Sequence, residues 1–130
     1  NVAAALGVGN LPSYPERLAR RREIDKRYRQ VLGQSPDVRL LQPLEGAESS
    51  CWLFGLRLER REDFGRAMKG RGVPVSVIDR RIDRHPVFGG LTAGLTGAEV
   101  FDAEHIAIPL HDGLSDDDVE QVTAAVLAGW

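Results

Sequence analysis

The chain is poor in the residues that mark several classes of protein. It has a single cysteine, Cys51, among 130 residues, so no disulfide forms within it and a reducing compartment, the cytoplasm, is expected. No apolar run is long enough to span a bilayer, and no charged segment precedes an apolar one as in a secretory signal. We therefore expect a cytoplasmic protein that has no membrane partner.

Neither sign of charge dominates the sequence. The 17 basic and 19 acidic residues give a net charge of -2, which argues against a general nucleic-acid surface. The hydrophobic content of 42% and the charged content of 28% are typical of a globular protein. Since the length suits one hydrophobic core and no internal repeat occurs, residues 1–130 are expected to form a single domain.

The common motifs for metals, nucleotides and nucleophilic catalysis are also missing. His85, His105 and His111 lie in separate loops without the spacing of metal ligands. The glycine-rich stretch 89–97 has neither the GxGxxG spacing nor the lysine of a P-loop. A nucleophilic pair of Cys51 and His85 would need an exposed thiol, which an apolar setting disfavours. No catalytic residue and no metal ligand is therefore assigned in this chain.

The most apolar stretch, Ser50–Leu58, predicts a central strand. The residues that alternate on one face are Trp52, Phe54, Leu56 and Leu58. Most of the residues between them are apolar too, so the strand should be covered on both faces for most of its length. A helix is the alternative interpretation of this run.

Helices and short strands are expected along the rest of the chain. Ser13 followed by Glu16 is typical of a helix start, and this helix should run to about Leu32. Ser115 and Asp118 form a capping box before the last helix, whose buried stripe is Val119, Val122 and Val126. The other expected elements are strands over 38–42, 73–78 and 106–110, and helices over 1–9, 61–70 and 98–104. Residues 51–78 then form a strand–helix–strand unit, as in an α/β fold.

Three stretches allow two interpretations each. The small apolar residues 1–9 form either a first core helix or an interface with something larger. Arg20–Arg22 is either a solvated helix face, which is the commoner case, or an anion patch. Asp116–Asp118 could bind a cation, but their position at a helix start explains them fully as capping residues.

Segment 79–88 brings together several groups that bind anions. It follows the expected strand 73–78, at the end where α/β sheets tend to place their ligands. Its donors suited to phosphate or carboxylate are Arg80, Arg81, Arg84 and His85. Alternatively, it is a surface loop whose acidic residues Asp79 and Asp83 pair with these arginines. The residues alone thus predict an α/β domain with a candidate anion-binding loop and leave both interpretations open.

Six segments, taken in order, carry a resemblance to a known family. They read NVAAALGVGNL, ARRREIDKRYRQVL, SSCWLFGL, GRGVPVS, HPVF and AIPLHDGLSDDDVEQV. Their order resembles the C-terminal small domain of the pyridoxal-phosphate-dependent sugar aminotransferases of the DegT/DnrJ/StrS family, and it covers essentially the whole chain. The resemblance implies a two-layer small domain of α/β (α+β-like) class, with a short mixed or antiparallel sheet and helices packed mainly on one face. Residues 1–12 would form the junction with a large domain.

The same resemblance implies a function. Members of this family have fold type I, are usually homodimers, and move an amino group, commonly from glutamate, to a keto group of a nucleotide-linked deoxysugar. Their cofactor, pyridoxal 5'-phosphate, is held mainly by the large domain through a Schiff-base lysine. The only lysines here, Lys26 and Lys69, lie in charged helices and not in the apolar setting that such a lysine needs. No cofactor-binding residue is therefore assigned, and the chain alone is expected to be inactive.

The resemblance also implies a substrate contact, because in this family the loop that holds HPVF approaches the sugar nucleotide. On that basis Arg81, Arg84 and His85 are candidate substrate-binding residues, with Asp83 orienting a neighbour. The competing hypothesis is a non-catalytic α/β binding or interaction module that uses an anion-binding loop at 79–88 or a partner surface at 1–9.

Overall fold

In the computed structural model, which describes residues 1–130, β2 (Phe54–Arg57) is the middle strand of a three-stranded antiparallel sheet. It pairs with β1 (Arg39–Leu40) on one side and with β3 (His105–Ile108) on the other. Leu56 faces Leu40 on one neighbour and Ile106 on the other, so apolar side chains lie across all the strands. The predicted central strand is therefore confirmed, although it is shorter than Ser50–Leu58.

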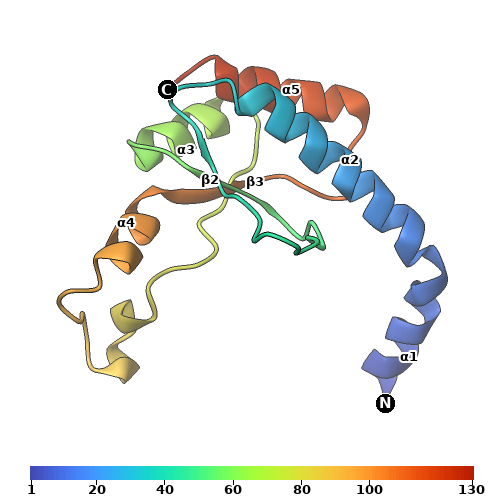
Figure 1. The fold of residues 1–130 in the computed structure, drawn as a ribbon, viewed down its shortest axis with the longest axis horizontal. Coiled ribbons are helices and arrows are strands. Elements are labelled where there is room, and N and C mark those ends of the chain that lie inside the picture. Colours follow the sequence, from blue (N-terminus) through green and yellow to red (C-terminus); the bar gives the residue numbers. More distant parts are fainter.

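The helices lie mainly on one face of this sheet, as predicted. They are α1 (Val2–Asn10), α2 (Tyr14–Leu32), α3 (Arg61–Gly70), α4 (Thr96–Glu104) and α5 (Asp116–Leu127). Figure 1 shows α2, α3 and α5 together above the sheet, with α4 to one side. No helix is both long and apolar enough to cross a membrane.

One hydrophobic core joins these three helices to the sheet. Its largest fully buried side chains include Tyr28 and Ile24 from α2, Phe64 from α3, and Phe54 from β2. Tyr28 meets Phe54 edge to face with 5.1 Å between ring centroids, and its hydroxyl donates to the Pro109 carbonyl at 3.0 Å. The polar end of this core tyrosine is thus satisfied while its ring packs against the central strand.

The predicted face of Trp52 is wrong. The chain turns at Cys51, which has a φ of +48° that few residues other than glycine adopt, and the period-two pattern begins only after this turn. Trp52 is consequently 69% exposed, whereas Phe54, Leu56 and Leu58 are buried as predicted. The Cys51 side chain itself is buried, in agreement with its apolar setting.

The predicted strand 73–78 is reduced to a single antiparallel bridge between Ser76 and Ala107 of β3. Since β2 is also antiparallel to β3, β2 and segment 73–77 run parallel to each other with β3 between them. The strand–helix–strand unit is thus present, but β3 is inserted between its two extended segments.

The predicted cap of α2 is also wrong. Ser13 lies in a short 3₁₀ turn, Leu11–Ser13, and its side chain makes no capping hydrogen bond; its hydroxyl donates to the Asn10 carbonyl at 3.1 Å. By contrast, Ser115 and Asp118 form the predicted capping box at the start of α5. Asp118 accepts from the Ser115 backbone N–H at 2.8 Å, which identifies it as a capping residue.

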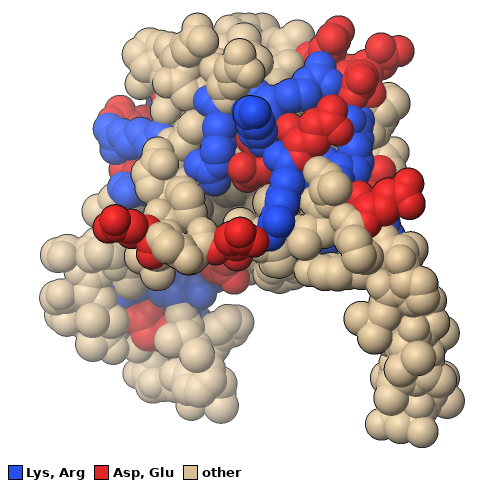
Figure 2. Space-filling model, turned by 45° about the vertical axis from the view of Figure 1, so that its right-hand side comes forward, with Lys and Arg blue, Asp and Glu red and all other residues tan.

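The arginines Arg20–Arg22 are neither a free anion patch nor simply solvated. Arg20 donates to Asp116 at 2.8 Å and Arg21 pairs with Asp112 at 2.7 Å, so α2 is tied to the start of α5. Arg17 also bonds Asp112, and these guanidinium groups hold the pKa of that carboxyl well below its usual range. Figure 2 shows the basic and acidic side chains of this face interleaved.

The core-helix interpretation of residues 1–9 is wrong, because no residue of α1 is buried. The helix extends away from the sheet (Figure 1), and it appears in Figure 2 as an arm without Lys, Arg, Asp or Glu side chains. Its exposed apolar side chains include Val2, Leu6 and Val8.

Candidate functional site

Segment 79–88 continues from the bridge at Ser76 and folds into two short 3₁₀ turns, Ile82–Arg84 and Pro86–Phe88. Pro86 begins the second turn, which suits its fixed φ, and Gly89 ends it with a φ of +90°. These turns fold the segment back toward α4, so that residues widely separated in the sequence come into contact.

Arg81 and Asp83 form a bidentate ion pair within this segment. Arg81 Nε donates to Asp83 Oδ1 at 2.8 Å, and a terminal nitrogen of Arg81 donates to Oδ2 at 2.5 Å. Asp83 Oδ2 also accepts from the Thr92 backbone N–H at 2.8 Å. The Arg81 guanidinium first, and then this N–H, lower the pKa of Asp83 to about 2. Asp83 is therefore a carboxylate that fixes the direction of Arg81.

A second carboxylate, Asp102 of α4, connects the other candidate residues. Asp102 is 5% exposed, accepts from the Arg81 backbone N–H at 3.0 Å, and pairs with Arg84 Nε at 2.7 Å. Glu99, one helical turn earlier, pairs with Arg81 at 3.2 Å. Sequence reasoning missed both acidic residues, although their spacing of three on an expected helix was a signal that they share a face.

The structure brings Arg81, Asp83 and Arg84 together around α4 and leaves His85 outside this network. The exposed His85 ring meets Phe88 edge to face, with 6.5 Å between ring centroids. Arg84 keeps 54% of its side chain exposed despite its pairing with Asp102. The groups that remain open to a ligand are thus Arg84 and His85, while the Arg81 guanidinium is largely committed to Asp83 and Glu99.

His105 follows α4 directly and is the first residue of β3, so it connects α4 to the sheet. It is 1% exposed and stacks on Phe101 with 4.4 Å between ring centroids. Its Nδ1 atom has no hydrogen-bond partner, and burial lowers the pKa of the ring. Arg61 of α3 donates to the carbonyls of Asp102 and His105, which ties the end of α4 to the helical layer.

Neither lysine of this chain has the shielded surroundings of a Schiff-base lysine. Covalent attachment of pyridoxal phosphate needs a lysine amine shielded from water, and both Lys26 on α2 and Lys69 on α3 are exposed. No group of three or more histidine, cysteine or acidic side chains is placed to hold a metal ion. The arrangement around residues 81–85 has donors that can bind and orient an anionic or hydroxylated ligand.

Comparison with known proteins gives consistent matches. The model of the DegT/DnrJ/EryC1/StrS aminotransferase family matches residues 1–127. A dTDP-4-dehydro-2,3,6-trideoxy-D-glucose 4-aminotransferase from Saccharopolyspora spinosa is 31% identical over 125 residues, which is 94% of this chain and 32% of that enzyme.

Solved structures match over the whole fold. The aminotransferase TlmJ from Streptoalloteichus hindustanus has a TM-score of 0.89 and 35% identity, and the match covers 98% of this chain and 35% of TlmJ. The sugar aminotransferase CalS13 from Micromonospora echinospora has a TM-score of 0.84 and 29% identity, with coverage of 97% and 34%. The chain thus spans about a third of the length of the relatives that it matches.

Proposed function

Because the chain belongs to the DegT/DnrJ/EryC1/StrS aminotransferase family, we propose that it is the C-terminal small domain of a pyridoxal-phosphate-dependent sugar aminotransferase. The reaction moves an amino group from an amino acid, with glutamate the expected donor, to a keto group of a nucleotide-linked deoxysugar. The observation that carries this proposal is the 31% identity, over 94% of the chain, to an enzyme named for amination of a dTDP-linked keto sugar. The cofactor is bound mainly by residues outside this chain, so these 130 residues are inactive alone.

The distribution of exposed apolar side chains supports a place within a larger enzyme. Apart from Val31 and Leu127, every exposed large apolar side chain lies in segments 2–14, 44–52 or 78–100. These segments extend on the side of the sheet opposite α3 and α5 (Figure 1). Such a concentration of apolar surface favours burial against other protein. In the proposal this side packs on the rest of a cytoplasmic homodimeric aminotransferase, with residues 1–12 as the junction.

Of the candidate substrate-binding residues Arg81, Asp83, Arg84 and His85, direct substrate contact is assigned to Arg84 and His85, and positioning of the segment to the Arg81–Asp83 pair. Arg84 and His85 supply exposed donors for phosphate or hydroxyl oxygens of the sugar nucleotide. Asp83 orients Arg81 through the bidentate pair, which restricts the rotation of the Arg81 guanidinium. In the proposal, this chain therefore contributes residues that bind the substrate. The covalent steps are carried out by residues elsewhere in the enzyme.

The decisive experiment compares His85→Ala with His111→Ala in the whole enzyme that carries this chain. His111 is an exposed histidine outside segment 79–88, so it is a matched control. His85→Ala should raise the KM for the sugar nucleotide about tenfold, the loss of one hydrogen bond to a charged group. Cofactor absorbance and the half-reaction with glutamate should not change.

Two results would reject parts of this proposal. Loss of cofactor together with sugar-nucleotide use in His85→Ala would show that the segment serves the cofactor site or the fold. Tight sugar-nucleotide binding by residues 1–130 alone would favour the non-catalytic binding module.

A further inference from the structure

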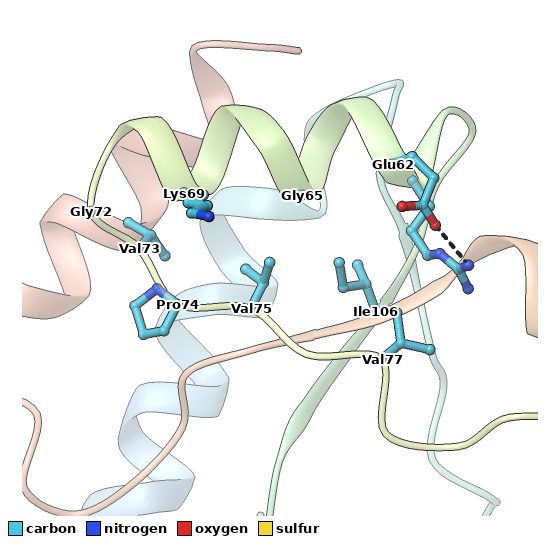
Figure 3. A pocket seen from close by; sticks show the side chains of 10 residues that line it. Glu62, Gly65, Lys69, Gly72, Val73, Pro74, Val75, Val77 and Ile106 are labelled. Carbon is cyan, nitrogen blue, oxygen red and sulfur yellow. Dashed lines mark hydrogen bonds and ion pairs between the residues drawn. The ribbon is translucent and has the colours of Figure 1, made fainter.

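A groove of about 650 Å³ lies between α3 and segment 73–77, away from segment 79–88. Figure 3 shows its two walls: Gly65 and Lys69 on the helix, and Val75 and Val77 on the extended segment, with Ile106 of β3 behind them. Arg61, Gly65 and Lys69 are spaced by four residues, so one face of α3 lines the groove. A Cβ added at Gly65 would meet no atom within 4 Å, and the absence of a side chain there leaves the groove open.

The extended wall of this groove is an unpaired sheet edge. Ser76 exchanges both of its backbone hydrogen bonds with Ala107, at 3.0 and 2.8 Å, so its polar groups point toward β3. In an antiparallel pair the flanking residues then point their N–H and C=O groups the opposite way. The N–H and C=O groups of Val75 and Val77 have no backbone partner. Exposure alternates along 73–78 as in a strand, so the backbone is already extended for further pairing.

The charges along the groove are not balanced. Arg61 is occupied by Glu62, at 3.0 Å, and by the carbonyls at the end of α4. Lys69, at the other end, is exposed, and Figure 3 draws no ion pair or hydrogen bond from it to the other residues of the groove. An occupant that carries a carboxylate at this end would complement the ammonium group.

We propose that this groove binds an extended peptide of a partner protein, which adds a strand beside Val75–Val77 beneath α3. Hydrogen bonds to the free edge would give affinity, and alternate apolar side chains would fill the space over Val75, Val77 and Ile106. An acidic residue on the same face of the peptide would pair with Lys69. Because α3 lies beside the edge formed by segment 73–77, the groove has room for a single extended peptide.

A second copy of this chain fits the groove poorly. Antiparallel pairing of two such edges requires a twofold axis perpendicular to the sheet, which places both copies of α3 on the same face. Each helix flanks its own edge, so the two helices would compete for the space over the new strands. The groove also lies on the α3 side of the fold, whereas the apolar segments proposed to pack on the rest of the enzyme extend on the other side.

The test uses the whole protein that carries this chain and blocked pentapeptides with a fluorescent label. The probe is valine-threonine-valine-threonine-glutamate, together with its reversed sequence, so that both strand directions are sampled. Fluorescence anisotropy measures affinity, and hydrogen exchange measures protection of the Val75 and Val77 amides. One probe should bind and protect both amides. Two further forms of the binding probe test its backbone contacts: one is N-methylated at the threonines and the other at the remaining residues. Because N–H groups alternate in direction along a strand, only one of these two sets faces Val75 and Val77. Methylation of that set should abolish binding, and methylation of the other set should not.

Two pairs of variants locate the site. An added Cβ at Gly65 meets no atom within 4 Å, so Gly65→Leu should project into the groove and weaken binding at least about tenfold. Gly70→Leu, in the same helix but outside the groove, should not weaken it. Leucine has a higher helix propensity than glycine, so neither variant is expected to lose binding through unfolding of α3. The parent protein should bind the glutamate probe more tightly than the same peptide with lysine in place of the glutamate. Lys69→Glu should reverse this preference, and Lys26→Glu on α2 should not.

Four outcomes would overturn the proposal: no binding of either probe, equal binding of both methylated forms, equal effects of Gly65→Leu and Gly70→Leu, or Val75 and Val77 amides already protected in the free protein. The last result would mean that the groove is filled by the protein's own residues or by a second copy.

Discussion

Gly55 of β2 lies directly against the imidazole of His105 on the neighbouring strand. A Cβ at position 55 would stand 2.9 Å from His105 Nε2 and 2.8 Å from a terminal methyl of Leu41. The His105 ring is 1% exposed and stacks on Phe101, so it has little space to move away from an added Cβ, and the close approach requires glycine.

Gly55→Ala should therefore destabilise the fold by about 1–3 kcal/mol, the usual cost of overpacking a buried site. Urea denaturation of this variant and of the control Gly65→Ala, where an added Cβ meets nothing, would measure the difference. If Gly55→Ala were as stable as the parent protein or more stable, His105 would move more easily than its packing indicates.

His105 should also make stability depend on pH. Burial first, and then the nearby Arg61, lower the pKa of the ring against an opposing effect of Asp79. The unfolded chain therefore binds a proton more readily than the folded chain, and folding stability falls as pH drops below about 6.5, the ordinary histidine pKa. The slope from this group is at most about 1.4 kcal/mol per pH unit. Midpoints of urea unfolding between pH 5 and 7 should shift in the parent protein and much less in His105→Gln; equal shifts would assign the dependence to another group.

The Arg81–Asp83 pair should make stability fall with decreasing pH as well, but in a more acidic range. Because the folded pKa of Asp83 is lowered to about 2, its contribution is present above about pH 4, the ordinary aspartate pKa, and is lost as pH falls toward 2. Asp83→Asn should be less stable than the parent at neutral pH and approach it as the pH drops through this range. A constant difference between the two proteins down to pH 2 would contradict the ion-pair explanation.

The two serines that precede helices should differ in their effect on stability. Ser115→Ala removes the capping box of α5 and should cost about 1 kcal/mol. Ser13→Ala, before α2, removes no cap and should change the unfolding free energy by less than about 0.5 kcal/mol. Thermal and urea unfolding of both variants would measure this, and similar losses at the two sites would show that the bond from Ser13 to Asn10 matters as much as a cap.

Sequence patterns predicted the features that depend on near neighbours along the chain. The capping box of Ser115 and the buried stripe of α5 follow from spacings of three and four, and the burial of Phe54 and Leu56 follows from alternation. These signals are contained within a single helix or strand, so the rest of the fold adds little to them.

The features that sequence reasoning missed depend on contacts between distant segments. Asp102 bonds Arg81 across 21 positions, and nothing in either local pattern names the other as its partner. The 73–78 segment has strand-like residues, but only Ser76 finds a paired neighbour, so most of the expected strand is absent. The turn at Cys51, which exposes Trp52, opposes the β preference of its apolar neighbours.

The insertion of β3 between β2 and segment 73–77 has a consequence for how the chain folds. Until residues 105–108 have been synthesised, β2 has only the two-residue β1 beside it, and segment 73–77 has no partner at all. A nascent chain that stops before them therefore carries unpaired strand edges, the surfaces on which aggregates nucleate. The sheet is therefore expected to form only after residues 105–108 have been made, when one short strand closes the gap between two segments that precede it in the chain.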